Sequence, residues 1–133
     1  MLKIQRHIYN SIIEQARKEA PIETCGYLAE KEGVVSNIFS LKNADASPEH
    51  FSFLPEEQFA AARQIRALQA KMRAVYHSHP ASPARPSAED IRLANDPTLS
   101  YVIVSLSEAQ PIIKSFIIRR GEVTPEPIEI LED

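Results

Sequence analysis

The sequence predicts an α/β (α+β) fold: a single domain, residues 1–133, in which helices flank and interrupt a mixed, mostly antiparallel sheet. Two segments repeat apolar side chains at helical spacing, and several others are short, β-rich and bounded by turn residues. A chain of 133 residues with 44% hydrophobic and 25% charged residues is long enough to bury its own core. No internal repeat or flexible linker divides it.

The first part of the chain predicts a strand, a helix and a hairpin. Residues 2–4 form a short strand. Residues 6–20 form a helix that ends at a proline, and its apolar stripe is Ile8, Ile12, Ala16 and Ala20. Residues 25–41 read as two strands joined at "EKEG", where Gly33 takes a positive φ. Alternating phenylalanines predict a half-buried strand over residues 50–54.

The second part predicts two helices and the remaining strands. A helix runs from Pro55 to Met72, because proline at the first position and two following glutamates suit a helix start. Residues 73–79 are extended, 87–96 form a short helix, and 100–107 form a strongly apolar, central strand. Residues 111–131 form the last strands, which turn at a glycine.

Composition narrows the possible functions. The net charge of −3 is dispersed, with no basic stripe, so no nucleic-acid partner is expected. No apolar run approaches the roughly 20 residues of a membrane span, and the N-terminus lacks the apolar core of a signal peptide. Cys25 is the only cysteine, which suits a reducing compartment, so we expect a cytoplasmic protein. Nothing in the sequence specifies an oligomeric state.

Two histidines close to a proline suggest a metal site. In an extended segment His77 and His79 project from one face, while Ser78 faces the other way. Zinc in hydrolytic sites is often held by two imidazoles and a carboxylate, which here is offered by Glu89 or Asp90. A fourth position would hold water with a pKa lowered toward about 7, which makes it a nucleophile.

The same residues also have an ordinary structural explanation. A His-x-His pair is by itself weak evidence, since such pairs are common on strand faces without a metal. "SAED" begins a helix in which Ser87 is the N-cap and Asp90 the third helical residue, as in a capping box. Residue spacing alone therefore leaves both interpretations open.

A family resemblance favours the metal site. "HSHPASPARPSAED", residues 77–90, resembles the signature of the JAMM (MPN+) metalloprotease family: His-Ser/Thr-His-Pro, six residues, Ser, two residues, Asp. "PIETCGYL" resembles the upstream segment of that family and places its glutamate at Glu23. The likeness extends over most of the chain, and five functional positions match in two separate segments. It implies an MPN/JAMM domain with a cytidine-deaminase-like architecture.

The resemblance also implies a role for each matched residue. One catalytic zinc ion would be held by His77, His79 and Asp90, with Glu23 as the proton shuttle and Ser87 as the hydrogen-bond donor to the oxyanion. Asp90 would then cap its helix with one oxygen and bind the metal with the other. Glu89 is one residue out of the motif and is expected to face solvent.

The family cleaves amide bonds after the C-terminal glycines of ubiquitin-like proteins. This chain has no obvious ubiquitin-gripping insertion and no extra Cys/His ligands, and it resembles the small prokaryotic members. Those hydrolyse the bond between the C-terminal glycine of a ubiquitin-like sulfur carrier protein and a newly made cysteine or similar adduct. The expected partner is thus a carrier with a Gly-Gly tail, and residues 41–53 and 80–86 are the expected groove walls.

Three alternatives accompany this hypothesis. The chain could be a non-catalytic MPN interaction scaffold, although such modules typically lack some ligands that this chain keeps. It could be a zinc peptidase that acts on small peptides rather than protein tails. Cys25, two residues from Glu23, is conceivable as a thiol nucleophile, but its apolar surroundings favour a buried, inert cysteine.

Overall fold

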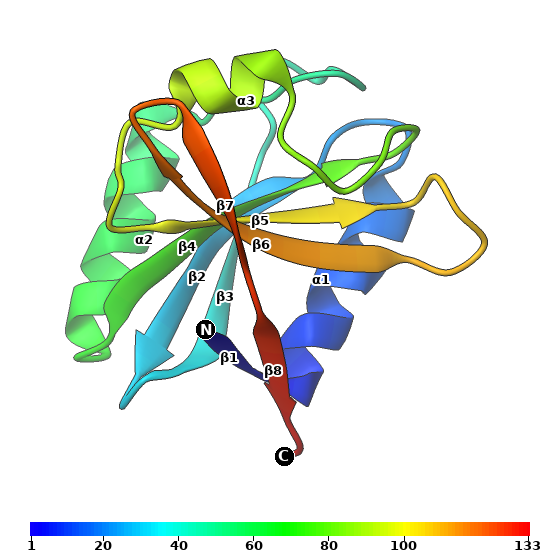
Figure 1. Cartoon of the computed structure of the whole chain (residues 1–133). Coiled ribbons are helices and arrows are strands. Elements are labelled where there is room, and N and C mark those ends of the chain that lie inside the picture. Colours follow the sequence, from blue (N-terminus) through cyan, green and yellow to red (C-terminus); the bar gives the residue numbers. More distant parts are fainter.

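All 133 residues are described by the computed structural model, whose centre is one large sheet (Figure 1). Its eight strands are β1 (Leu2–Gln5), β2 (Cys25–Lys31), β3 (Val34–Leu41), β4 (Lys71–His79), β5 (Ser100–Ser105), β6 (Ile112–Arg119), β7 (Glu122–Glu126) and β8 (Ile128–Leu131). They lie in the order β7-β6-β5-β4-β2-β3-β1-β8. The β2–β3, β2–β4, β5–β6 and β6–β7 pairs are antiparallel, and β1–β3, β1–β8 and β4–β5 are parallel. The predicted mixed, mostly antiparallel sheet is confirmed.

Three helices flank the sheet: α1 (Arg6–Glu19), α2 (Pro55–Ala67) and α3 (Ala88–Leu93). Ile8, Ile12 and Ala16 of α1 pack on one face, in the largest hydrophobic cluster, together with buried side chains of β1 to β6, whereas Ala20, predicted on the same stripe, lies just beyond the helix and is exposed. The opposite face carries two smaller clusters, one under α2 and one beside α3. Ile12 is fully buried in the α1 cluster, so truncating it to alanine would cost about 2–5 kcal/mol of stability.

Gly26 allows the central strands to pack closely. A Cβ atom at this position would overlap both the Phe39 carbonyl oxygen and the Tyr76 ring. Tyr76 is fully buried, and its hydroxyl donates to the Gln15 side chain of α1 at 2.5 Å. A side chain at residue 26 would therefore disturb the pairing that places Cys25 opposite His77 in β4.

The predicted turns at Gly33 and Gly121 are confirmed, with φ of 82° and 79°. The predicted strand over residues 50–54 is wrong: residues 51–54 have no sheet partner. Ser52 bonds instead to Ala44 and Asn43 within the β3–α2 loop, so its backbone joins no ladder.

Two predicted helix ends are also wrong. Helix α2 ends at Ala67 rather than Met72, because a turn with Gln69 at positive φ reverses the chain into β4. Met72 then packs toward α2 from the strand, so an apolar residue at helical spacing serves the same core from another element. Helix α3 ends at Leu93 rather than residue 96. No helix has the length and apolar character needed to cross a membrane.

Candidate metal centre

The C-terminal end of β4 places two imidazoles side by side. His77 and His79 are buried, with 4% and 5% of their surface exposed. Ser78 points the other way, and its hydroxyl accepts a hydrogen bond from the Thr24 backbone N–H at 2.8 Å. The Ser78 N–H in turn donates to the Thr24 carbonyl at 3.0 Å. These bonds hold the residues just before β2, including Glu23, against the end of β4.

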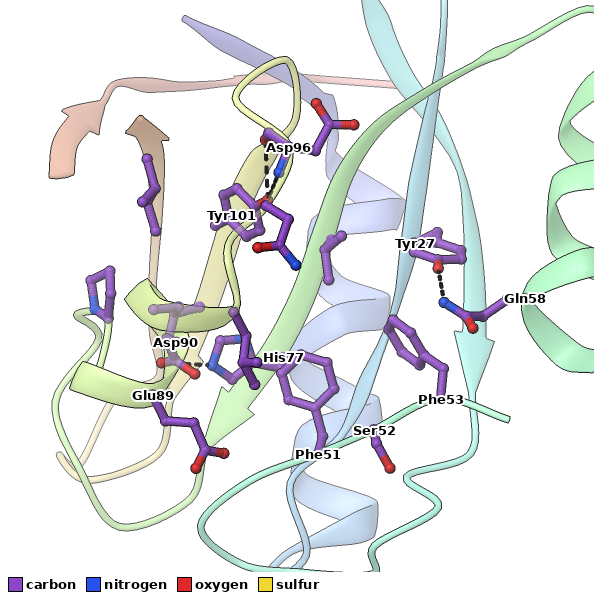
Figure 2. Close-up of a pocket in the computed structure, with 16 residues that line it drawn as sticks. Tyr27, Phe51, Ser52, Phe53, Gln58, His77, Glu89, Asp90, Asp96 and Tyr101 are labelled. Atoms are coloured by element: carbon purple, nitrogen blue, oxygen red, sulfur yellow. Dashed lines mark hydrogen bonds and ion pairs between the residues drawn. The ribbon is translucent and has the colours of Figure 1, made fainter. Parts of the chain in front are cut away.

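The start of α3 supplies the carboxylate. Ser87 is the N-cap, and its hydroxyl oxygen accepts from the Asp90 N–H at 3.0 Å, while the Ser87 N–H donates to Asp90 Oδ2 at 2.9 Å. This capping box confirms the predicted helix start. It also directs the Asp90 side chain at His77, as Figure 2 shows.

Three ligand atoms converge at this point. His77 Nε2 lies 3.1 Å from His79 Nε2, and Asp90 Oδ2 lies 3.2 and 3.1 Å from them. Tetrahedral ligands about 2.0–2.1 Å from a zinc ion are about 3.3 Å apart, so this triangle fits a zinc ion. His79 Nδ1 is 2.8 Å from the Pro83 carbonyl oxygen, a contact that leaves Nε2 directed at the other two donors. His77, His79 and Asp90 could therefore hold one metal ion.

One detail of the Asp90 prediction is wrong. Capping and metal binding were expected to use different carboxylate oxygens. The same oxygen, Oδ2, accepts the Ser87 N–H and faces both imidazoles. The reason is that the capping bond turns this oxygen toward the end of β4. A carboxylate oxygen has two lone pairs, so it can accept the N–H and still coordinate a cation.

The electrostatics of the three groups are consistent with a cation site. Burial lowers the pKa of His79, but hydrogen bonds with Asp90 and the Pro83 carbonyl outweigh it and leave that pKa raised. For Asp90, burial raises the pKa, and the bonds from His77 and His79 bring it well below its usual range. The pocket therefore favours a carboxylate facing positive charge.

Glu23 lies beside this triangle, in the segment before β2. Only 3% of its surface is exposed, and its Oε1 atom is buried without a hydrogen-bond partner. Burial raises the pKa of Glu23 to about 8, while the charge of His79 opposes the shift and that of Asp90 adds to it. A buried carboxylate without a partner is costly unless it binds a proton or a cation. A pKa near neutrality also suits a group that moves protons at pH 7.

The two remaining candidates, Glu89 and Cys25, take no part in the metal-ligand triangle. Glu89 is exposed and pairs at 3.8 Å with Arg92, so it stands apart from the three ligand atoms, as predicted. Cys25 is fully buried, and burial raises the pKa of its thiol to about 12. A thiol that stays protonated at neutral pH is a poor nucleophile, which supports the expected packing role.

A cleft of about 360 Å³ begins at His77 and runs across the sheet face between α2 and α3 (Figure 2). One wall comes from the expected loop, through Phe51, Ser52 and Phe53, and Phe51 packs on the His77 ring with centroids 4.8 Å apart. Of the other expected wall, residues 80–86, only Pro86 takes part.

The sequence analysis did not predict the residues that line the rest of the cleft. Its far side consists of α3 and the residues after it, together with Tyr101 and Ile103 of β5. These two side chains share one face of a strand, which alternation alone could have shown. Gln58 of α2 donates to the Tyr27 hydroxyl at 2.9 Å and lines the near wall.

Comparison with known sequences adds independent information. Residues 5–118 match the family model Prok-JAB, described as prokaryotic homologs of the JAB domain. The CysO-cysteine peptidase of Mycobacterium tuberculosis is 33% identical over 135 residues, which covers 99% of this chain and 92% of that protein. The desampylase of Pyrococcus furiosus is 30% identical over 90 residues, covering 68% of this chain and 64% of that one.

Solved structures agree with the fold. A protein from Desulfitobacterium hafniense superposes with a TM-score of 0.91 at 43% identity, covering 100% of this chain and 94% of that chain. A structure described as JAMM, a metalloprotease-like zinc site in the proteasome and signalosome, superposes with a TM-score of 0.64 at 24% identity, covering 99% of both chains. At that identity the second likeness concerns the fold alone.

Proposed function

The chain belongs to the family of prokaryotic homologues of the JAB domain, and on that premise we propose that it is a zinc-dependent hydrolase of a sulfur carrier adduct. Its relatives named as a peptidase and a desampylase support a hydrolase. The proposed substrate is a ubiquitin-like carrier whose C-terminal glycine forms an amide bond with cysteine or a similar adduct. We place the reaction in the cytoplasm, because a chain whose one cysteine is buried and free suits a reducing compartment.

One observation carries the proposal: three metal-ligand atoms within 4.8 Å of one another lie beside a buried carboxylate oxygen that has no partner. A structural cluster would satisfy its buried polar atoms internally. The ligand atoms of His77, His79 and Asp90 instead converge on one point, and the buried Oε1 atom of Glu23 is left without a partner. A divalent cation with a bound water would satisfy all of them.

In the proposed mechanism each residue has a separate task. A zinc ion held by His77, His79 and Asp90 would supply Lewis acidity and lower the pKa of a water molecule to about 7. Glu23 accepts the proton of the attacking water and passes it to the nitrogen of the leaving amine. The Ser87 hydroxyl oxygen accepts the Asp90 N–H, which leaves its own proton free to bond the substrate carbonyl oxygen as negative charge develops there.

The cleft supports a protein tail as substrate. The backbone N–H and C=O groups of Phe51 and Phe53 make no hydrogen bond within the chain, whereas those of Ser52 between them are bonded. An extended tail could pair with these free groups as an added strand. Glycines at the end of the tail have no side chains, so they could pass between Phe51 and Pro86 without a steric clash.

The test is incubation of the zinc-loaded protein with a carrier–cysteine conjugate, with mass detection of the released group. We expect release of cysteine and an intact carrier tail. Glu23→Gln should keep its zinc and lose about 10²–10⁴-fold in rate, because the proton shuttle is gone while the ligands remain.

Free peptides of the same terminal sequence, without the carrier body, provide the control. Equal turnover of free peptide and conjugate would favour a small-peptide peptidase. A purified protein that contains no zinc and cannot be loaded would favour a non-catalytic scaffold. Full activity of Glu23→Gln would remove Glu23 from the mechanism.

A further inference from the structure

The loop between β3 and α2, residues 42–54, is organised around one buried side chain. Asn43 is 8% exposed. Its amide nitrogen lies 3.1 Å from the Glu23 carbonyl oxygen, 3.0 Å from that of His50 and 3.4 Å from that of Ser47. All three neighbours are acceptors, so the amide nitrogen must face them.

The other end of the Asn43 amide organises the loop itself. Its oxygen accepts the backbone N–H of Asp45 at 3.0 Å and that of Ser52 at 3.4 Å. The side chain of Asp45 adds a second set of links, to Ser52 Oγ at 2.8 Å and to His50 Nδ1 at 3.0 Å. The loop thus keeps internal bonds that do not depend on Asn43.

Glu23 depends on this loop for its position. Its N–H donates to the Ser47 carbonyl at 2.9 Å, and its carbonyl accepts from Asn43, so the loop holds the peptide group on each side of the residue. Its Oε1 atom has no partner, so no hydrogen bond anchors that oxygen. The place of the carboxylate is therefore set mainly through its backbone.

The metal-ligand atoms are held by other contacts. The Thr24–Ser78 bonds join the end of β4 to the residue after Glu23, the Pro83 carbonyl orients His79, and the capping box orients Asp90. The Asn43 side chain makes no hydrogen bond with the three ligands. A change at Asn43 should therefore separate the placement of Glu23 from metal binding.

We propose that Asn43 is a positioning residue for Glu23. By holding the backbone carbonyl of Glu23, Asn43 fixes the Glu23 carboxylate beside the metal-ligand triangle. This inference rests on the proposed role of Glu23 as proton shuttle. The donor half of the amide bonds the Glu23 carbonyl together with the loop carbonyls of Ser47 and His50, and the acceptor half bonds the loop N–H groups of Asp45 and Ser52. Displacing a reacting group by about 1 Å can cost on the order of 10²-fold in rate, so losing the donor has a measurable effect.

Three variants separate the two halves of the amide. Asn43→Ala removes both. Asn43→Asp keeps the acceptor for Asp45 and Ser52 and loses the donor to the carbonyls of Glu23, Ser47 and His50, and it serves if the alanine variant does not fold. Ser47→Ala is the matched control, because it removes only the bonds from its hydroxyl oxygen to the Glu49 and His50 N–H groups. Its backbone carbonyl, which holds Glu23, remains.

The kinetic test is a double-mutant cycle on zinc-loaded protein with the carrier–cysteine conjugate. We expect Asn43→Ala and Asn43→Asp to lower kcat about 10–100-fold, with zinc affinity and KM within about threefold of wild type and Ser47→Ala unchanged. In the Glu23→Gln background the Asn43 substitutions should cost less than about twofold more, because residues that act through one group are not additive. An equal loss in both backgrounds, an equal loss in Ser47→Ala, or no loss at all would overturn the inference.

A second readout needs no turnover. NMR couplings of the Glu23 side chain in the zinc-loaded, substrate-free protein should show one χ1 rotamer in wild type and in Ser47→Ala, and averaging in Asn43→Ala. A single rotamer in all three would overturn the inference. If wild type fails to hydrolyse the conjugate, the proposed function fails, and the NMR result still decides whether Asn43 positions Glu23.

Discussion

Two carboxylate side chains with little exposed surface, Glu126 of β7 and Glu23 before β2, lie beside the two ends of β4 in opposite circumstances. Near its start, Arg73 donates to Glu126 at 2.9 Å, and Ser100 and Ser115 donate to the other oxygen of Glu126 at 2.6 and 2.7 Å. At its end, beside the two histidines, Glu23 has a buried oxygen with no partner. A carboxylate with hydrogen-bond partners on both oxygens thus lies beside one end of β4, and one with an unpartnered oxygen lies beside the other.

This contrast distinguishes structural from functional burial. For Glu126, burial raises the pKa, but the bonds from Ser100, Arg73 and Ser115 outweigh it and leave the pKa lowered. For Glu23, burial prevails and raises the pKa to about 8. A buried carboxylate whose oxygens all have hydrogen-bond partners within the protein contributes to the fold. A buried carboxylate with an unpartnered oxygen indicates a site for a cation or a proton.

The largest effect is expected when a metal ligand is removed. Asp90→Ala takes away the only carboxylate among the three donors and should lower zinc affinity by at least about 100-fold, since even outer-shell partners are worth 10–100-fold. Hydrolysis should fall below detection. Equilibrium dialysis against zinc measures the first effect and conjugate turnover the second.

Glu89→Ala is the matched control for Asp90→Ala, because its carboxylate is adjacent in sequence but exposed. It should retain zinc. Loss of zinc in Glu89→Ala with retention in Asp90→Ala would reverse the assignment of the third ligand.

The second effect is an opposite pH dependence of stability at the two ends. The lowered pKa of Glu126 means that its stabilisation is present above about pH 4.5 and is lost as the pH falls through the folded pKa. Glu126→Gln should therefore cost about 3 kcal/mol of unfolding free energy at pH 7, and less in acid. Zinc binding should be unchanged.

Glu23 should show the reverse. Its folded pKa of about 8 exceeds the unfolded value of 4.5, so the unfolded chain ionises first and the metal-free protein loses stability as the pH rises from 4.5 to about 8. Relative to wild type, Glu23→Gln should gain stability across that interval. Urea unfolding of chelator-treated proteins at several pH values measures both variants, and parallel curves for wild type and Glu23→Gln would refute the contrast.

Ser87 should show a smaller, mixed effect. Ser87→Ala removes the proposed oxyanion donor and the helix cap, so kcat should fall by about 100-fold and stability by about 1 kcal/mol. Thermal unfolding and turnover of the zinc-loaded variant separate these losses. Ser87→Thr, which keeps a hydroxyl, should recover most of both; a Ser87→Ala protein that loses stability but keeps its turnover would show that Ser87 only caps α3.

The smallest effect is expected at Cys25. Cys25→Ala removes a buried thiol whose pKa of about 12 keeps it protonated, so activity should stay within about twofold of wild type. Stability should fall by about 1 kcal/mol from lost packing. Resistance of wild-type turnover to thiol-alkylating reagents gives the same information, and loss of turnover would bring back the thiol nucleophile.

Local rules explain which parts of the fold could be predicted. Helix α1, the glycine turns and the capping box depend on residues that are neighbours in sequence, so the sequence predicts them correctly. The segment 50–54 alternates like a strand, yet it has no partner strand, and pairing is a long-range property. Met72 fits the helical period of α2 but lies in β4, because the turn at Gln69 comes first.

The candidate site divides in the same way. His77 and His79 share a strand face, and the helix start presents Asp90, so their convergence follows from local geometry and the family motif. The burial of Glu23 and its anchoring by Asn43 depend on a loop from another part of the chain. Such contacts have no sequence period, so only the folded chain reveals them.

The most direct test of the central claim is a calorimetric zinc titration of wild type and Glu23→Gln at pH 7 in buffers of different ionisation enthalpy. The claim is that His77 and His79, at the C-terminal end of β4, form a metal centre with Asp90, and that Glu23 lies beside it. It predicts one zinc ion per chain for both proteins, and about one additional proton released by wild type, because Glu23 with a pKa of about 8 is mostly protonated until a cation binds nearby. Zinc binding with the same number of protons released by both proteins, or no zinc binding at all, would contradict it.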